Sequence, residues 1–343
     1  MRDSDHFGRP IRTIADVQSV LDSNRASFEE LLNCVYVSQA ESAWDLYEEG
    51  SRRALQAAIS QSRIRVPSLV EAAGHLVKAI MRRAGDLSDL EARADEAMDV
   101  LDSIEPSIST RDNLEGGIAA FRTRTLSELS TLRVLVADPS IDGLLRLCAR
   151  LRKWVERPDL AVVAGERAKT LEPNNPAVLT TLGAAYADLG EYGPARQHLE
   201  IVLRVDPDAK QAVTSLSRVE YETGNFNESH RLALRAFELE PDRFSAHRLL
   251  SSALATGDDE AFREAQEAVS ELRENDTEFS QDGYLDFLSA KILYEAGQVE
   301  EALSVAKAVV DTTDTSSAVK TQARQLINKI NSDRQGRFEL GKG

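Results

Sequence analysis

Histidine is the side chain here with the widest catalytic and metal-binding repertoire, so the spacing of its copies is informative. The five histidines are His6, His75, His198, His230 and His247. None has a second histidine or a cysteine three or four residues away, the spacing that would place two ligands on one helical face. His75 follows Glu71 by one helical turn, but two ligands do not make a metal site. We therefore predict no metal site and expect surface or packing roles for the histidines.

Other catalytic signatures are also absent from the sequence. Cys34 and Cys148 match neither a CxxC motif nor a zinc-ligand spacing, so we expect two reduced, buried thiols. The phosphate-binding patterns GxGxxG and GxxxxGKS/T do not occur, and neither do the hydrolase patterns HExxH and GxSxG. We therefore expect no catalytic residue and no cofactor, and we predict that the chain is not an enzyme.

The composition favours a helical, acidic protein. Of 343 residues, 42% are hydrophobic, which is enough for a core, whereas only 6% are aromatic. Ala, Leu, Glu and Arg are abundant, and all four favour helices. The net charge of −16 would repel a phosphate backbone, so we expect no nucleic-acid partner. No apolar run approaches about 18 residues and the start, MRDSDHFGRPIRT, has no apolar segment, so we expect no membrane span, no signal peptide and a cytoplasmic location.

Steps from an acid to a proline recur along the chain at a regular interval. They are Glu105-Pro106, Asp138-Pro139, Glu172-Pro173, Asp206-Pro207 and Glu240-Pro241, and the last four prolines are each 34 residues apart. Proline cannot continue a helix and disfavours helical angles in the residue before it, so each step predicts a helix end. Gly190 and Gly224 share the same spacing and fall in turns. The repeating unit is therefore helix, turn, helix, stop.

This unit resembles the tetratricopeptide repeat (TPR), whose period is also 34 residues. The strongest match is unit 176–209, which has Leu179, Leu182, Gly183, Tyr186, Ala195, Leu199 and Pro207 at the positions of the family pattern. Leucine replaces only the Trp and the Phe of that pattern. Gly183 and Ala195 are small where the two helices should approach each other, and Tyr186 and Leu199 should fill the space between them.

The resemblance implies an all-α fold, a right-handed α-solenoid of TPR helix hairpins with an N-terminal helical bundle. We expect an N-terminal helical region over residues 1–72 and degenerate helical repeats over 73–141. The TPR array should span 142–316 in about five units, of which 244–282 is irregular. Residues 317–343 should form a capping helix and a tail, because a repeat array needs its apolar end covered.

The first 72 residues carry their own helical signals. Ser27 and Glu30 have the spacing of a capping box, and an apolar stripe follows it through Trp44 and Tyr47. Either Gly50 ends this helix, or one helix runs to about residue 60. The aromatic residues Tyr36, Trp44 and Tyr47 are either an exposed face for dimerisation or docking, or the core of a helical bundle.

The resemblance also indicates which side chains line the concave groove, where proteins of this family hold peptide segments of their partners. It assigns the fifth and ninth residues of each unit to that surface, and the twelfth residue of some units. The candidate groove residues are Arg146, Arg150, Lys153, Arg218, Tyr221, Arg248, Phe287, Lys291 and Tyr294. None of these positions is acidic, although the chain has 57 acids and 41 bases.

A basic groove would bind an acidic peptide or a C-terminal carboxylate, because arginine can hold a carboxylate at two points. Tyr221, Phe287 and Tyr294 would add apolar contacts. The alternative is that the cations pair with acids on neighbouring helices and hold the array together.

These features together predict an adaptor or scaffold that binds a protein or peptide partner. One alternative is a bacterial regulator that senses a peptide and joins a helical bundle to TPR units. Another is an enzyme, or a non-catalytic subunit of an enzyme complex, with the site in the N-terminal region. Homo-oligomers could form through the N-terminal helices.

Overall fold

The computed structural model describes residues 11–23, 26–60, 66–104, 115–275, 283–312 and 317–340. Within these ranges the regular structure is helical and contains no strand, which confirms the predicted all-α class. The tertiary contacts group the chain into two compact units, residues 1–181 and 182–343, called unit 1 and unit 2 below.

Unit 1 begins with three helices, and the second of them starts with the predicted capping box. They are α1 (Ile14–Leu21), α2 (Phe28–Ala40) and α3 (Trp44–Ser60). The Ser27 hydroxyl accepts a hydrogen bond from the Glu30 amide, and the Glu30 carboxylate accepts one from the Ser27 amide. This is the predicted capping box, and it satisfies two backbone donors at the start of α2.

The break between α2 and α3 lies earlier than the sequence predicted. The helix does not end at Gly50; it ends at Ala40, and the chain turns at Ser42, whose φ is +56°. Gly50 instead lies inside α3, where an added Cβ would be 3.2 Å from Cγ2 of Val35. Both expected readings of this segment are therefore wrong, because Gly50 serves the close packing of α2 on α3 rather than a helix end.

The aromatic stripe forms part of a core in unit 1. Tyr47 is fully buried, and its hydroxyl lies 2.8 Å from Nδ1 of His75. The guanidinium of Arg82 lies 3.5 Å from the centroid of the Trp44 ring, within cation–π range. Of the three aromatic residues, Tyr36 alone is exposed, and its hydroxyl bonds to Glu71. The core alternative is confirmed for Tyr47.

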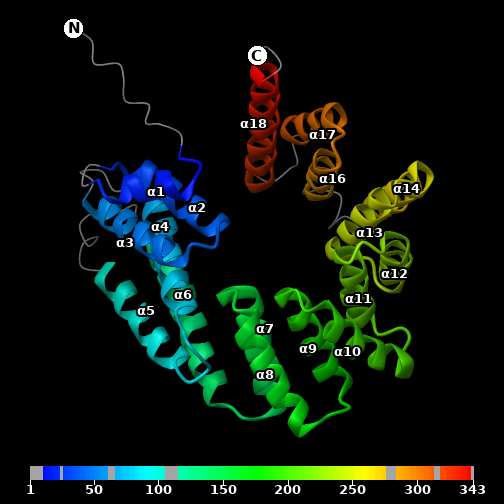
Figure 1. The fold of residues 1–343 in the computed structure, drawn as a ribbon, viewed down its shortest axis with the longest axis horizontal. Coiled ribbons are helices and arrows are strands. Elements are labelled where there is room, and N and C mark those ends of the chain that lie inside the picture. The colour runs from blue at the N-terminus through cyan, green and yellow to red at the C-terminus, as the bar shows by residue number, and fades with distance from the viewer. Residues whose placement is uncertain are drawn as a thin grey trace. The chain divides into compact units, whose positions relative to one another are not determined.

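Three longer helices follow in unit 1. They are α4 (Val66–Arg82), α5 (Leu90–Ile104) and α6 (Glu115–Ala137). Helices α4 and α5 precede the repeat array and contact each other. Helix α6 contacts both α4 and α5 (Figure 1).

The hairpins of the expected repeat array are present. They are α7 (Ile141–Arg150) with η2 (Leu151–Val155) and α8 (Pro158–Leu171), α9 (Pro176–Leu189) with α10 (Tyr192–Val205), α11 (Lys210–Glu222) with α12 (Phe226–Leu239), α13 (Arg243–Thr256) with α14 (Asp259–Asn275), and α16 (Tyr284–Glu295) with α17 (Val299–Asp311). Helices α9 and α11 begin at residues 176 and 210, which gives the predicted 34-residue period. Gly190 and Gly224 turn the chain inside these hairpins with φ of +84° and +80°.

The best-matching hairpin packs as its sequence predicted. A Cβ at Gly183 on α9 would lie 2.8 Å from Cγ of Leu199 on α10, so only glycine permits this approach. Leu199 and Ala195 are fully buried, and the rings of Tyr186 and His198 meet edge to face at 5.6 Å. The small and large residues of the repeat therefore interdigitate between its two helices.

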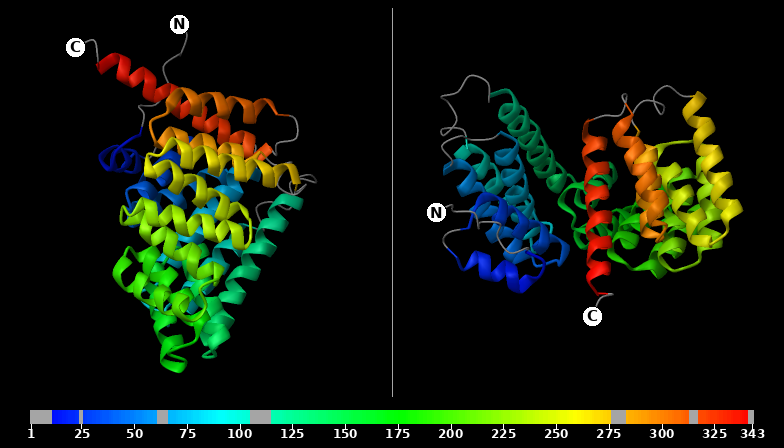
Figure 2. Two further views of the ribbon diagram at one scale, coloured as in Figure 1. Left: turned by 90° about the vertical axis from the view of Figure 1, so that its right-hand side faces the viewer. Right: turned by 90° about the horizontal axis from the view of Figure 1, so that it is seen from above.

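The first helices of successive hairpins form a layer in unit 2. Helix α11 contacts α13, α13 contacts α16, and α16 contacts α18 (Ser317–Leu340). Helix α18 also lies along α17 in both views of Figure 2. Its buried residues Ala323, Leu326 and Ile330 pack against the apolar residues of the last hairpin.

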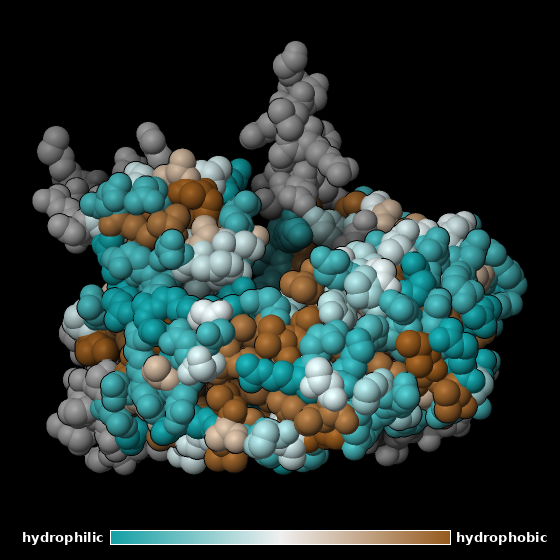
Figure 3. All heavy atoms as spheres, turned by 60° about the horizontal axis from the view of Figure 1, so that its bottom comes forward, coloured by the Kyte–Doolittle hydropathy of each residue, from teal (hydrophilic) through white to brown (hydrophobic). Residues whose placement is uncertain are grey.

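Some large apolar side chains reach the surface. Val205 is 77% exposed and Phe244 is 81% exposed. On the face that Figure 3 shows, hydrophobic patches alternate with hydrophilic side chains. No helix in the described ranges has the length and hydrophobicity needed to cross a bilayer.

Candidate functional site

The first-helix layer of unit 2 brings together a cluster of predicted groove residues. Arg218 and Tyr221 lie on α11, Arg248 lies on α13 and Lys291 lies on α16. The guanidinium carbon of Arg248 is 5.3 Å from the centroid of the Tyr221 ring, so the two residues make a cation–π contact between neighbouring first helices. We call these four residues the α11–α16 cation cluster.

Arg248 is the distinctive member of the cluster. Its side chain is half-buried, yet among the described residues no carboxylate lies within ion-pair distance of its guanidinium. Burial lowers the pKa of Arg248 and the nearby charge of Arg218 lowers it further, whereas Glu222 acts in the opposite direction. Because Arg248 is half-buried beside a second cation, the binding of an anion there is electrostatically favourable.

Arg218 already has an internal partner. It bonds to the carboxylate of Asp188 on α9, and both side chains are partly buried. For Arg218, this pairing agrees with the alternative stated above, in which the cations pair with acids on neighbouring helices and hold the array together. The sequence did not reveal it, because Asp188 lies 30 residues away and the prediction did not place it on the inner surface.

His247 is a cluster neighbour that the sequence analysis did not select. Burial lowers its pKa to about 4, and the charges of Arg248 and Lys291 lower it in the same direction. The imidazole is therefore neutral at pH 7 and adds no positive charge. Its position next to Arg248 in the sequence was the only available signal.

The predicted aromatic contacts of the last hairpin are partly used inside the fold. Phe287 is partly buried against the apolar core that α13, α16 and α17 share. Tyr294 packs against the same hairpin, and the ammonium of Lys329 on α18 lies 5.3 Å from its ring centroid. Tyr221 is therefore the aromatic residue of the predicted set that directly contacts a cluster cation.

The predicted groove residues of unit 1 occupy different environments. Arg146 forms a long ion pair of 3.5 Å with Asp142, one turn away on α7. Arg150 pairs with Glu128 on α6. Lys153 lies in η2 and lines a cavity that α4 and α6 complete. Two of these three cations therefore have carboxylate partners within unit 1.

The chemistry of the cluster suits recognition rather than catalysis. Its charged groups are two guanidiniums and one ammonium, whose N–H donors match carboxylate oxygens. One aromatic face supports the central guanidinium. Such a surface can hold an anionic side chain or a chain terminus.

The chain was compared with family models, curated proteins and solved structures. No family model matches the chain, and no curated protein matches it. The chain is similar to the crystal structure of a tetratricopeptide repeat protein from Parabacteroides merdae, with 15% identity and a TM-score of 0.41 over 88% of this chain and 98% of that chain.

Two further solved structures are similar. TTC0263, a thermophilic TPR protein of Thermus thermophilus, has 16% identity and a TM-score of 0.42 over 55% of this chain and 99% of that chain. Yeast Tom70 has 12% identity and a TM-score of 0.41 over 96% of this chain and 68% of that chain. The hairpins, their period and their close-packed glycine thus give the chain a repeat architecture similar to that of tetratricopeptide repeat proteins.

Proposed function

We propose that this chain is an interaction module that binds an acidic segment of a partner protein at the α11–α16 cation cluster. Arg248 carries the proposal, because its guanidinium is half-buried and has no carboxylate within ion-pair distance among the described residues. A bound carboxylate would supply the missing counter-charge through two parallel hydrogen bonds.

The neighbours of Arg248 support the same kind of ligand. Arg218 lies close enough to lower the pKa of Arg248, so the two positive charges act on the same region. The exposed Lys291 extends that region along α16. Tyr221 fixes one face of the Arg248 guanidinium and leaves its edge available for an acidic group.

Asp188 sets a condition on binding. A ligand carboxylate must either share Arg218 with Asp188 or take its place. Because exposed ion pairs contribute only about 0–1 kcal/mol each, a useful affinity also requires apolar contacts from the partner. The ligand we expect is therefore a segment in which acidic and apolar residues are mixed.

The test uses a peptide of alternating leucine and glutamate residues, with both ends blocked, titrated into the full chain by calorimetry. We expect Arg248→Glu to weaken binding by about tenfold or more, which corresponds to about 1.4 kcal/mol. The matched control is Arg263→Glu on α14, which makes the same charge change at an exposed second-helix position. Equal affinities for the parent, Arg248→Glu and Arg263→Glu would refute the proposed site.

A second form of the peptide separates two sources of the carboxylate. Freeing its C-terminus adds one carboxylate without changing the side chains. Tighter binding of the free form, lost in Arg248→Glu, would indicate recognition of a chain end. Equal binding of both forms would indicate recognition of acidic side chains.

A further inference from the structure

Unit 1 contains a cavity of about 290 Å³ between α4, α6 and η2. Its apolar lining includes Val77 on α4, Phe121 on α6 and Trp154 on η2. Lys78, Lys153 and Glu156 line it as well and supply its charged groups. This volume is just below the range of about 300–1,000 Å³ that ligand pockets occupy, so the cavity can hold only a small ligand group.

The charges on the cavity do not cancel. The ammonium of Lys78 lies 2.5 Å from the carboxylate of Glu156, so these two residues neutralise each other. Lys153 is exposed, and it makes no ion pair with any other residue that the structure describes. The cavity therefore combines an apolar lining with one unpaired positive charge.

An unusual stretch of backbone presents these groups to the cavity. Residues Leu151–Val155 form a π-helical turn, and Glu156 then adopts left-handed angles with φ +58° and ψ +44°. Such angles are unfavourable for a residue with a Cβ, and π-helical turns are frequent at functional sites. The turn brings Lys153 and Trp154 to the cavity while Glu156 reaches back to Lys78.

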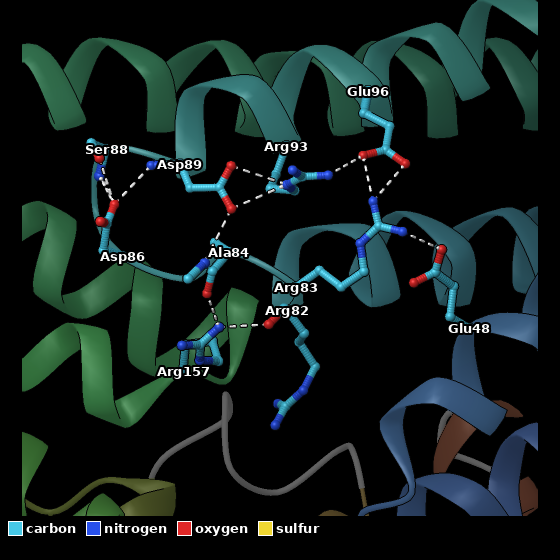
Figure 4. Close-up of polar contacts among 11 residues, drawn as sticks. Glu48, Arg82, Arg83, Ala84, Asp86, Ser88, Asp89, Arg93, Glu96 and Arg157 are labelled. Carbon is cyan, nitrogen blue, oxygen red and sulfur yellow. Dashed lines mark hydrogen bonds and ion pairs between the residues drawn. The ribbon is translucent and has the colours of Figure 1, made fainter.

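Contacts from α4 hold this turn in place. The Arg82 guanidinium donates a hydrogen bond of 2.5 Å to the carbonyl of Glu156. The Arg157 guanidinium donates to the carbonyls of Arg82 and Ala84, as Figure 4 shows. Arg157 is also paired with Asp159. Arg82 holds the carbonyl of Glu156, and the next residue, Arg157, is anchored to the end of α4. Because of these two contacts, the strained conformation persists in the folded protein.

We propose that this cavity binds a small carboxylate with an apolar body, either a free acid or the C-terminal residue of a peptide. The apolar body enters between Val77, Phe121 and Trp154, and the carboxylate pairs with Lys153. Lys78 stays with Glu156 and adds no net charge. This site is independent of the proposed acidic-segment site in unit 2, so each can fail without the other.

The test follows the fluorescence of Trp154. The chain has two tryptophans, so Trp44→Phe leaves Trp154 as the only one. The probe is 3-phenylpropionate, and 3-phenylpropionamide is the matched neutral probe of the same shape. We expect a saturable change in emission with the acid. The amide should bind at least about tenfold more weakly than the acid.

Substitutions then test whether Lys153 supplies the positive charge and whether the ligand occupies the cavity. Lys153→Gln should weaken binding of the acid by about tenfold, whereas Lys169→Gln on α8, which lies outside the cavity lining, should leave it unchanged. Gly74→Met should block the cavity, because Gly74 lines it and its Cβ position is 3.8 Å from the Phe121 ring.

Calorimetry on the unmodified chain repeats the comparison of acid and amide, so a folding defect in a variant does not decide the result. A tripeptide Gly-Gly-Phe with a free or an amidated end distinguishes a peptide terminus from a free acid as the natural ligand. Absence of saturable binding of the acid, equal binding of acid and amide, or full binding to Lys153→Gln would overturn the proposal.

Discussion

The guanidinium of Arg196 on α10 holds both carboxylate oxygens of Glu220 on α11. Its Nε lies 2.6 Å from Oε1, and its Nη2 lies 3.0 Å from Oε2. Glu220 is only 6% exposed, and the side-chain amide of Asn225 also donates to it, at 2.7 Å. Glu220 stands where the tetratricopeptide pattern has tyrosine. A polar link between consecutive hairpins therefore replaces the aromatic filler in this unit.

We expect Glu220→Gln to lower the free energy of unfolding by about 2 kcal/mol, because hydrogen bonds to charged groups contribute about 1.5–3 kcal/mol. The change leaves Arg196 without its counter-charge while preserving side-chain size. Denaturant unfolding followed by circular dichroism measures the effect. Glu238→Gln, an exposed position on α12, is the matched control and should change stability by less than about 0.5 kcal/mol. Equal stabilities of the two variants would show that the pair contributes little.

Gly183 and Gly193 provide a matched test of close helix packing. A Cβ at Gly183 would be 2.8 Å from Cγ of Leu199 and 3.3 Å from the Ala195 carbonyl oxygen, whereas a Cβ at Gly193 would meet nothing within 4 Å. We expect Gly183→Ala to destabilise the protein by about 1–3 kcal/mol through overpacking. Gly193→Ala should be neutral or slightly stabilising, because alanine favours helices. Thermal unfolding of both variants checks the contrast, and a harmless Gly183→Ala would mean that the two helices separate readily.

Glu156 allows the cost of its left-handed backbone to be measured. Both Glu156→Ala and Glu156→Gly remove the ion pair with Lys78, but only glycine relieves the strain at φ +58°. We therefore expect the glycine variant to be more stable than the alanine variant by about 1 kcal/mol, the reverse of their order in ordinary helices. Chemical denaturation of the pair gives the difference directly. If the alanine variant were the more stable, the strain would be absent in solution.

His247 should make stability depend on pH. The unfolded histidine takes up a proton near its ordinary pKa of 6.5, whereas the folded one stays neutral until about pH 4. Between these values the unfolded state binds more protons, so the free energy of unfolding decreases as the pH falls from 7 towards 4. The stability that neutral, buried His247 contributes is fully present above pH 6.5 and is lost progressively as the pH falls towards 4.

We expect His247→Asn to flatten this part of the profile relative to the parent chain. Denaturant unfolding at a series of pH values measures it. His75 and His230 also have lowered pKa values, so the variant should keep their share of the dependence. Parallel profiles for parent and variant would show that His247 is not buried as described.

The sequence predicted those features that depend on local or periodic signals. The proline and glycine spacing gave the hairpins, the small residues Gly183 and Ala195 gave their close approach, and Ser27 with Glu30 gave a helix start. Each of these depends on interactions within one helix or between two consecutive helices. Such interactions leave a readable pattern in the sequence.

The features that the sequence did not predict depend on contacts between distant residues. The pairing of Arg218 with Asp188 joins α11 to α9, two helices that are not consecutive in the chain, and it became visible only in the packed structure. The left-handed turn at Glu156 depends on arginines and a lysine, and two of these residues lie on α4, more than 70 positions earlier. A charged residue in a sequence does not indicate which of many acids will meet it.

Helix α18 has a consequence for what a shortened chain would do. It covers the outer side of α16 and α17 through Val319, Ala323, Leu326 and Ile330. Removing the chain from residue 317 onward would leave Leu303 and Val309 facing water. Such an uncovered apolar side would pack against the same side of a second truncated molecule, so we expect the shortened chain to dimerise or precipitate. Helix α18 thus keeps the apolar end of this stack of hairpins out of water.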